Sequence, residues 1–168
     1  KAKKKNINEL VVCILNRPRH QELIRTCRDA GARIMLISDG DVSGVIATSE
    51  EESGVDIYMG VGGSPEGVLA AAALRCIGGQ MQTRLLFKNE NEISRAKKIG
   101  INDLNKIYDL NELAYGDVMF AATGVTDGNM LRGVKNKQGS AYTESIVMRS
   151  STQTIRKIKA KHNVKNKF

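Results

Sequence analysis

The residues of this chain best suited to bind a phosphate lie in a glycine-rich stretch at 60–67, Gly-Val-Gly-Gly-Ser-Pro-Glu-Gly. Alternating apolar residues precede the stretch and an alanine-rich run follows it, which predicts a strand, a turn and a helix. Ser64 is suited to be the N-cap of that helix and Pro65 to be its first residue. Glycines let a ligand approach the backbone, and the free N–H groups of a helix start favour an anion. Glu66 fits beside a phosphate only with a cation between them, so the stretch predicts a phosphate-and-metal site.

Two shorter groups of residues could add charge to such a site. Arg17 and Arg19 follow one apolar run, and Asp39 and Asp41, on either side of Gly40, follow the next. The arginines either bind an anionic ligand or are solvated residues in the first turn of a helix. The two carboxylates either hold a metal or sugar hydroxyls, or form an Asx turn and cap the next helix.

The elements that carry these groups alternate between strands and helices in the first half of the chain. Apolar runs at 10–15, 33–38 and 55–61 predict strands, and a helical pattern follows each of them. Such a βαβαβα series implies a mainly parallel sheet with helices on both faces. Because ligands of these sheets bind outside the carboxyl ends of the strands, we expect the three groups to meet there.

The second half of the chain predicts further strands, some of them antiparallel. We expect strands at 83–87 and 117–122, a helix at 89–99, a short strand with a turn at 107–113, and paired strands at 131–134 and 141–148 around a turn at 136–139. The segment from Thr152 is expected to begin as a strand or a helix. The prediction is therefore one α/β domain over residues 1–168, with a mainly parallel or mixed sheet layered with helices.

The net charge of +8 is concentrated at the two ends of the chain. Residues 1–8 and 156–168 read as basic tails with four and six positive charges, and the remainder, with 16 bases against 18 acids, is nearly neutral. Such tails can attract polyanions, but seven Phe and Tyr and no Trp offer little base stacking, so nucleic-acid binding is not favoured. The sequence shows no apolar run that would span a bilayer and no signal-peptide pattern, so no membrane partner is expected.

The cysteines and the first histidine are interpreted as structural. Cys13, Cys27 and Cys76 have no metal-binding spacing and predict buried free thiols, which are typical of a reducing cytoplasm. His20 is interpreted as a structural or solvent-facing residue, because a lone histidine is poor evidence for catalysis.

Several motifs in collinear order resemble the class II fructose-1,6-bisphosphatases, a family of metal-dependent, lithium-sensitive sugar phosphatases. Some members also act on sedoheptulose 1,7-bisphosphate. The resemblance rests on the segments Arg17 to His20, Asp39 to Asp41, Gly62 to Val68, Gly79 to Leu85, Ala122 to Gly128, Tyr142 to Ser145, and Thr154 to Arg156 with Arg149. The family's proteins are longer, and this chain is similar to their carboxyl-terminal half. The resemblance therefore implies the carboxyl-terminal half of a sugar-phosphatase-type layered α/β fold.

The resemblance gives a role to each candidate residue. The implied substrate-binding set is Arg17, Arg19, Asp39, Gly40, Asp41 and Gly63. Within this set the arginines would hold the phosphate distal to the reaction, the Asp-Gly-Asp group the sugar hydroxyls, and the glycine a substrate group through its backbone. Glu66 would be a ligand of Mn²⁺ or Mg²⁺.

The resemblance also implies what this sequence lacks. The family's other metal-binding acids, and an Asp-x-x-Asp-Gly-Thr motif that helps orient the attacking water, belong to the amino-terminal half and do not occur here. No catalytic residue is therefore assigned to this chain. Its implied partners are that amino-terminal half, a sugar bisphosphate and further copies in a homo-oligomer. The complete protein would hydrolyse the 1-phosphate of fructose 1,6-bisphosphate in gluconeogenesis, and the chain in isolation would be a non-catalytic phosphosugar-binding module.

Overall fold

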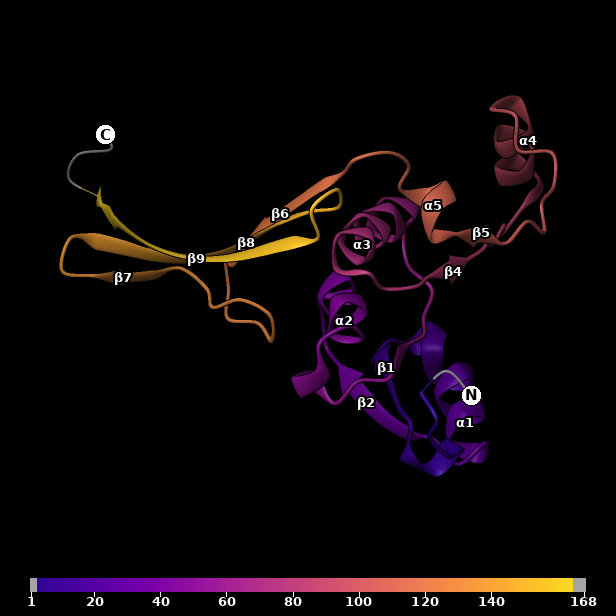
Figure 1. The fold of residues 1–168 in the computed structure, drawn as a ribbon. Helices are drawn as coiled ribbons and strands as arrows, with labels where there is room; N and C mark the ends of the chain where they lie inside the picture. The colour runs from indigo at the N-terminus through magenta and orange to yellow at the C-terminus, as the bar shows by residue number, and fades with distance from the viewer. Residues whose placement is uncertain (1–2, 165–168) are drawn as a thin grey trace.

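The computed structural model describes residues 3–164 and begins with a three-stranded parallel sheet (Figure 1). Its strands are β1 (Val11–Leu15), β2 (Arg33–Ile37) and β3 (Ile57–Tyr58), in the order β2-β1-β3. β1 and β2 pair in register from the first residue of each strand to the last. The predicted mixed α/β fold is confirmed, although β3 is shorter than the apolar run that predicted it.

Three helices follow these strands and carry the candidate site. They are α1 (Gln21–Asp29), α2 (Asp41–Ala47) and α3 (Ser64–Ile77), accompanied by 3₁₀ turns at Ile7–Glu9, Pro18–His20 and Glu51–Ser53. α1 is amphipathic and buries Ile24 and Cys27 against Val12 and Ile14 of the central strand. Burial of these apolar faces fixes the carboxyl end of β1, from which the two arginines follow.

α3 is the central element of the molecule. Its alanines are small enough to let both α2 and the antiparallel sheet formed within residues 119–163 approach closely. The helix is therefore buried on more than one side. The core between α2, α3 and that antiparallel sheet consists of Ile46, Ala73, Cys76, Phe120, Leu131, Ile146 and Met148. Since α3 begins at the glycine turn, this core also fixes the position of the turn.

The connection after α3 contains less strand than the sequence predicts. β4 (Gln82–Thr83) pairs with β5 (Tyr108–Asp109), and α4 (Glu90–Lys98) and α5 (Leu110–Leu113) complete the segment. The predicted strand at 83–87 is wrong beyond its first residue. Among the described residues no strand pairs with 84–87, and Leu86 is 54% exposed.

The chain ends in a four-stranded antiparallel sheet that projects from the helices as an arm (Figure 1). It consists of β6 (Met119–Thr123), β7 (Lys135–Lys137), β8 (Ser140–Arg149) and β9 (Thr154–Asn163). β6 and β7 share one edge of β8, and β9 pairs with the whole of the other edge. The predicted second strand of the hairpin at 141–148 is confirmed within β8, whereas the predicted first strand at 131–134 is wrong, because the strand that pairs with β8 there is β7 at Lys135–Lys137.

Two further predictions about this region are corrected. The residues 156–163, predicted as part of a basic tail, form most of β9, because each of them pairs with a residue of β8. The hairpin turn is made by Gln138 and Gly139, which both have positive φ and therefore suit the twist of the strands. Lys1, Lys165 and Lys167 of the predicted tails lie outside the described residues.

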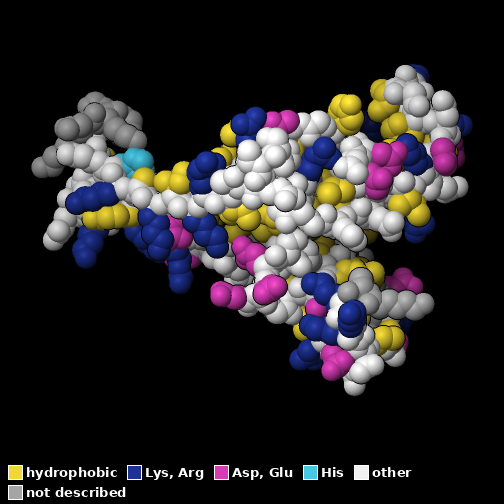
Figure 2. Space-filling view, in the orientation of Figure 1, with side chains coloured by type: hydrophobic (Ala, Val, Ile, Leu, Met, Phe, Trp, Pro, Cys, Tyr) yellow, Lys and Arg dark blue, Asp and Glu magenta, His cyan; other side chains and the backbone are white. Residues whose placement is uncertain are grey.

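The lysines of β9 form a basic face on the arm (Figure 2). Lys157, Lys159 and Lys161 alternate with Ile158 and Ala160 along the strand and therefore lie on one face. Several of these charges are partly neutralised: Lys159 lies 3.3 Å from Glu144, Lys157 lies 3.8 Å from Glu50, and Lys161 lies over the ring of Tyr142 at 5.8 Å from its centre. The basic face is thus in part a set of intramolecular ion pairs, which weakens its attraction for a polyanion.

The three cysteines are buried free thiols, as the sequence predicts. Burial raises the pKa of both the Cys13 and the Cys76 thiol, which keeps them protonated and unreactive. Over the part of the chain that the structure describes, the helices are too short or too polar to cross a bilayer.

An ion pair between Asp117 and Arg149 joins the segment before β6 to the end of β8. The Arg149 Nη2 atom donates to Asp117 Oδ2 at 2.7 Å, and Ser150 donates to the other carboxylate oxygen at 3.1 Å. The Arg149 guanidinium lowers the pKa of Asp117 from 3.8 to about 2, with smaller contributions from the Ser150 hydroxyl and from the hydroxyl and N–H of Ser151.

The lowered pKa predicts an acid dependence of stability. Because the folded-state pKa lies below the unfolded one, the stabilisation is complete above pH 3.8 and is lost as the pH falls toward 2. We expect Asp117→Asn to lower the free energy of unfolding at pH 7, and the difference from wild type to vanish near pH 2. Urea titrations over this range measure it. The control is Asp29→Asn, whose carboxylate makes no ion pair among the described residues; a difference that persists unchanged at pH 2 contradicts the prediction.

Candidate functional site

The three groups of candidate residues meet at one edge of the parallel sheet. β1, β2 and β3 run in the same direction side by side, so the segments that follow them emerge together. The Arg17–Arg19 segment leaves the central strand, with the Asp39–Asp41 segment on one side and the Gly60–Gly63 turn on the other. The predicted meeting of the three groups is therefore what the topology produces.

The arginine segment and the glycine turn are joined by direct hydrogen bonds to the Val61 backbone. Arg19 Nε donates to the Val61 carbonyl at 2.8 Å, and the Val61 N–H donates to His20 Nε2 at 2.9 Å. The terminal nitrogens of Arg19 make no hydrogen bond among the described residues, and its side chain is exposed. These nitrogens remain available to an anion in front of the turn.

The Asp39–Asp41 segment also reaches the turn. Gly40 has a φ of 81°, a left-handed conformation that glycine adopts without strain, and it is the N-cap of α2. A Cβ atom on Gly62 would lie 3.2 Å from Asp41 Oδ2, which places that carboxylate against the turn. Gly40 rather than an aspartate is the N-cap of α2, so the capping alternative is wrong, although Asp41 Oδ1 accepts from the Val42 N–H at 3.2 Å. Asp41 Oδ2 and the exposed Asp39 carboxylate make no hydrogen bond among the described residues and stay accessible to a ligand.

The start of α3 differs by one residue from the prediction. Gly63, in an extended conformation, is the N-cap, and Ser64 is the first helical residue, which moves Pro65 to the second position. The serine hydroxyl makes no capping hydrogen bond. A glycine at this place matters because a Cβ atom on Gly63 would overlap the carboxylate of Glu66. Glu66 thus folds back over the turn, and its exposed carboxylate lies directly beside the backbone that the sequence assigns to substrate.

Tyr58, at the end of β3, is a neighbour of the site that the sequence reasoning missed. Its ring packs against Gly44, where a Cβ atom would lie 3.0 Å from the ring, and its hydroxyl lies 3.4 Å from the Cβ position of Gly60. Burial, and then the charge of Asp41, raise the pKa of Tyr58 to about 12. The phenol therefore stays a neutral O–H donor at ordinary pH. An amphipathic aromatic residue directly before a glycine turn was the available signal.

The described residues do not form a complete metal site. No group of three or more His, Cys, Asp or Glu side chains suited to a metal occurs between residues 3 and 164. The carboxylate oxygens of Asp41 and Glu66 are nevertheless the kind of ligand that Mg²⁺ and Mn²⁺ prefer. The donor type fits such an ion, and the number of donors requires further ligands from elsewhere.

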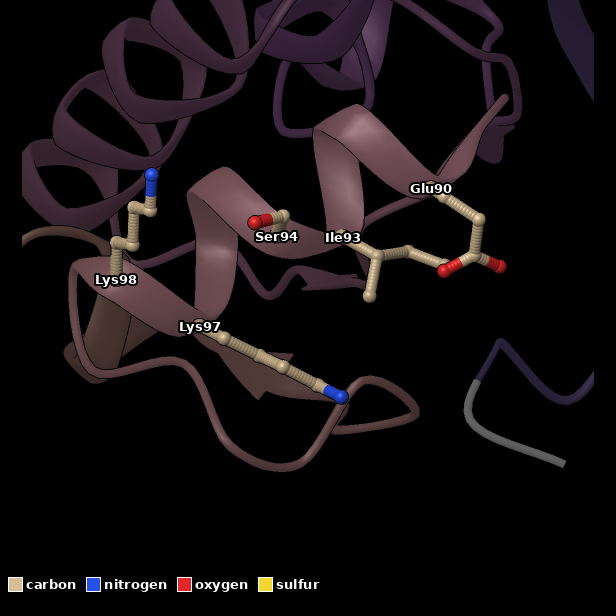
Figure 3. Close-up of a pocket in the computed structure, with 5 residues that line it drawn as sticks. All are labelled: Glu90, Ile93, Ser94, Lys97 and Lys98. Atoms are coloured by element: carbon tan, nitrogen blue, oxygen red, sulfur yellow. The ribbon is translucent and has the colours of Figure 1, made fainter.

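Two measurable surface hollows lie away from this edge. One, of about 410 Å³, is lined by five residues of α4 alone, and Figure 3 shows their side chains spread along that single helix. Another, of about 480 Å³, lies between α3, α5 and the arm and is lined by Arg75, Leu110, Asn111, Gly116, Asp117, Ser150 and Ser151. Neither hollow contains a residue of the three groups.

Comparison with known proteins gives a consistent family. The family described as "Bacterial fructose-1,6-bisphosphatase, glpX-encoded" matches residues 1–162. A relative from Synechococcus elongatus, named D-fructose 1,6-bisphosphatase class 2/sedoheptulose 1,7-bisphosphatase, is 43% identical over 93% of this chain and 49% of its own length. Relatives of the same name from Crocosphaera subtropica and Trichormus variabilis are 42% and 43% identical over 94% and 93% of this chain.

The extent of these matches is unequal. The chain spans about half the length of the curated relatives it matches, whereas it is itself matched almost throughout. The family match includes all three groups at the sheet edge and the arm as far as residue 162 of β9. On this evidence the chain belongs to the family of bacterial, glpX-encoded fructose-1,6-bisphosphatases.

Proposed function

We propose that this chain supplies the sugar-binding and distal-phosphate-binding part of a metal-dependent sugar-bisphosphate phosphatase. In the complete protein the reaction is hydrolysis of the 1-phosphate of fructose 1,6-bisphosphate, a step of gluconeogenesis. The observation that carries the proposal is the meeting of arginines, aspartates and a glycine turn with Glu66 at one sheet edge, in a chain of this family. The names of the relatives support sedoheptulose 1,7-bisphosphate as a second substrate.

Each group has a role that its chemistry supports. Arg17 and Arg19 bind the phosphate that is not hydrolysed, since a guanidinium can give two parallel hydrogen bonds to it. Asp39 and Asp41 accept hydrogen bonds from sugar hydroxyls, and Gly40 lets the chain turn between them. Gly63 contacts the substrate through its backbone, where a side chain would collide with Glu66.

Glu66 is the residue of this chain that would hold Mn²⁺ or Mg²⁺. When bound, such an ion neutralises phosphate oxygens and makes a water nucleophilic at neutral pH. The remaining ligands, and the residues that orient that water, come from the other half of the family's polypeptide. This chain's own residues bind and orient the sugar and the distal phosphate, which brings the reacting phosphate toward Glu66.

The proposal extends to partners and compartment. The chain works with the amino-terminal half of the same protein, within a homo-oligomer in the cytoplasm, and has no membrane or nucleic-acid partner. The three buried thiols support a reducing compartment. The ion pairs on the arm support a structural use of its basic residues.

Phosphate release tests this function. We expect the complete polypeptide, with the amino-terminal half preceding this chain, to release phosphate from fructose 1,6-bisphosphate with Mn²⁺ or Mg²⁺ and to stop in excess EDTA. The control is the same assay with fructose 6-phosphate, which lacks the 1-phosphate. Absence of release with either metal contradicts the proposal.

A second candidate function, binding without catalysis, is favoured for this chain in isolation by its incomplete metal ligand set. In that case residues 1–168 alone bind fructose 1,6-bisphosphate in calorimetry and leave it intact. Turnover by the isolated chain would contradict the assignment of catalytic residues to the other half.

A further inference from the structure

We propose that His20 is a positioning residue of the substrate site, whose neutral ring, protonated on Nδ1, holds the Val61 peptide and thereby the Gly62–Gly63 turn. The inference rests on the proposed function for the ligand and on the structure for the contacts. His20 has 0% exposure and is the only buried polar or charged side chain among residues 3–164. A fully buried imidazole between two site segments needs all its polar atoms satisfied, and this one has partners on both nitrogens.

The partners fix the proton on one nitrogen of the ring. Nδ1 lies 2.8 Å from the Leu15 carbonyl oxygen, which can only accept, so Nδ1 carries the hydrogen. Nε2 lies 2.9 Å from the Val61 nitrogen, whose N–H can only donate, so Nε2 is the acceptor. The Val61 carbonyl is also 3.2 Å from Nε2, but it already accepts from Arg19 Nε, and a proton on Nε2 would leave the Val61 N–H without its acceptor. The neutral Nδ1–H tautomer alone satisfies both strong contacts.

These contacts replace apolar packing as the anchor of the turn. The side chains of Met59 and Val61 are 37% and 41% exposed, so neither buries the turn into the core. The last backbone hydrogen bond between the β3 segment and β1 is donated by the Met59 N–H to the Cys13 carbonyl, at 3.0 Å. Beyond it, the backbone is held at Val61, where His20 accepts from the N–H and Arg19 donates to the carbonyl.

The geometry therefore couples the two ligand-binding groups. Adjacent residues of one 3₁₀ turn, Arg19 and His20, bind the carbonyl and the N–H of the same residue, Val61. The ring also lies close to Gly60, where an added Cβ atom would come within 3.4 Å of the ring atom Cε1. Loss of the His20 bond leaves the Arg19 bond to the Val61 carbonyl as the remaining side-chain tie of the turn, which loosens the backbone that carries Gly62 and Gly63.

Two substitutions separate the bond to the turn from the bond to the strand. In His20→Gln the longer amide can place an acceptor oxygen near the Val61 N–H. In His20→Asn the shorter amide can keep a donor at the Leu15 carbonyl, but it is too short to accept from the Val61 N–H, so the bond to the turn is lost. In the complete protein we expect His20→Asn to raise the KM for fructose 1,6-bisphosphate at least about tenfold, a loss of about 1.4 kcal/mol of binding. We expect His20→Gln to restore it to within about threefold of wild type, with both variants melting as one cooperative transition.

The control is His162→Gln, a change of the other histidine of the chain, which lies on the arm and contacts Thr143. It is expected to leave KM unchanged. Equal KM values for His20→Asn, His20→Gln and wild type would overturn the proposal, as would equal large losses in both His20 variants with folding intact.

A spectroscopic measurement keeps the inference testable without activity or substrate. The 168-residue chain has two histidines, so its ¹⁵N-labelled form gives two ring systems, and His162→Gln in the same chain assigns them. We expect the His20 ring to show a protonated Nδ1 and a bare Nε2 at pH 7. An Nε2–H tautomer, or a doubly protonated ring, overturns the proposal even if the variants do not fold. A correct tautomer in a protein that does not hydrolyse fructose 1,6-bisphosphate would count against the proposed function alone.

Discussion

Replacing Glu66 by glutamine in the complete protein is expected to reduce metal-dependent phosphate release from fructose 1,6-bisphosphate at least about 100-fold, or roughly 2.7 kcal/mol of transition-state stabilisation. The change keeps the size of the side chain and removes the negative charge that a divalent ion requires. The carboxylate lies over Gly63 at the start of α3, which the proposed function places beside the reacting phosphate. The measurements are kcat/KM with Mn²⁺ and Mn²⁺ affinity by calorimetry.

The control for this change is Glu22→Gln. Glu22 is an exposed glutamate in the first turn of α1, so both substitutions remove the same favourable interaction with a helix N-terminus, about 0.3–1 kcal/mol. We expect the two variants to lose similar stability and only Glu66→Gln to lose metal affinity. A fall in activity of less than about twofold for Glu66→Gln, below 0.5 kcal/mol, would contradict its role as a metal ligand.

Gly124→Ala is expected to cause the largest loss of stability among single glycine changes in the arm, about 3 kcal/mol or a fall in Tm of roughly 6–12 °C. Gly124 follows β6 where two backbone segments cross. A Cβ atom there would overlap the Arg132 carbonyl oxygen and lie 2.8 Å from its carbon. At the same crossing, a Cβ atom on Gly133 would lie 2.5 Å from the Thr126 carbonyl carbon. Since the obstacles are backbone atoms, no side-chain rotation can relieve them.

The crossing is held by specific bonds, which limits relaxation. The Gly124 N–H donates to the Glu144 carbonyl at 3.0 Å, and the Gly133 N–H donates to Asp127 Oδ1 at 3.0 Å. The matched control is Gly128→Ala in the same loop, where a Cβ atom would lie 3.7 Å from the nearest atom. Thermal and urea unfolding of the two variants measure the difference. Equal Tm values for Gly124→Ala and Gly128→Ala would contradict the close approach.

Several features of the site are predictable because they are local. The apolar runs before Arg17 and Asp39 predict strands, and the rule for parallel sheets then brings the following residues to one edge. The start of α3 is predictable to within one residue from Pro65, whose fixed φ suits either of the first two helical positions. The N-cap is Gly63 rather than Ser64. Local propensity distinguishes poorly between adjacent residues as the first residue of a helix, so the sequence alone does not settle this difference of one residue.

Other features depend on partners distant in the chain. The segment at 84–87 has the residue pattern of a strand but no strand lies beside it among residues 3–164, and pairing rather than propensity decides such cases. The basic residues 156–163 look like a tail by composition, and they become β9 because β8 offers a full edge.

The sequence by itself thus determined the residue types of the site, the order of strands and helices that carries them, and the family to which they point. The tertiary structure alone decided that His20 is fully buried, which nitrogen of its ring carries the proton, and that Val61, 41 residues later, is its partner. It also decided that Tyr58 and Asp41 share one neighbourhood and that Gly124 meets the Arg132 backbone. The reason is physical: periodicity and turn residues report local backbone conformation, whereas contacts between distant residues arise only when the packed core fixes the elements that carry them.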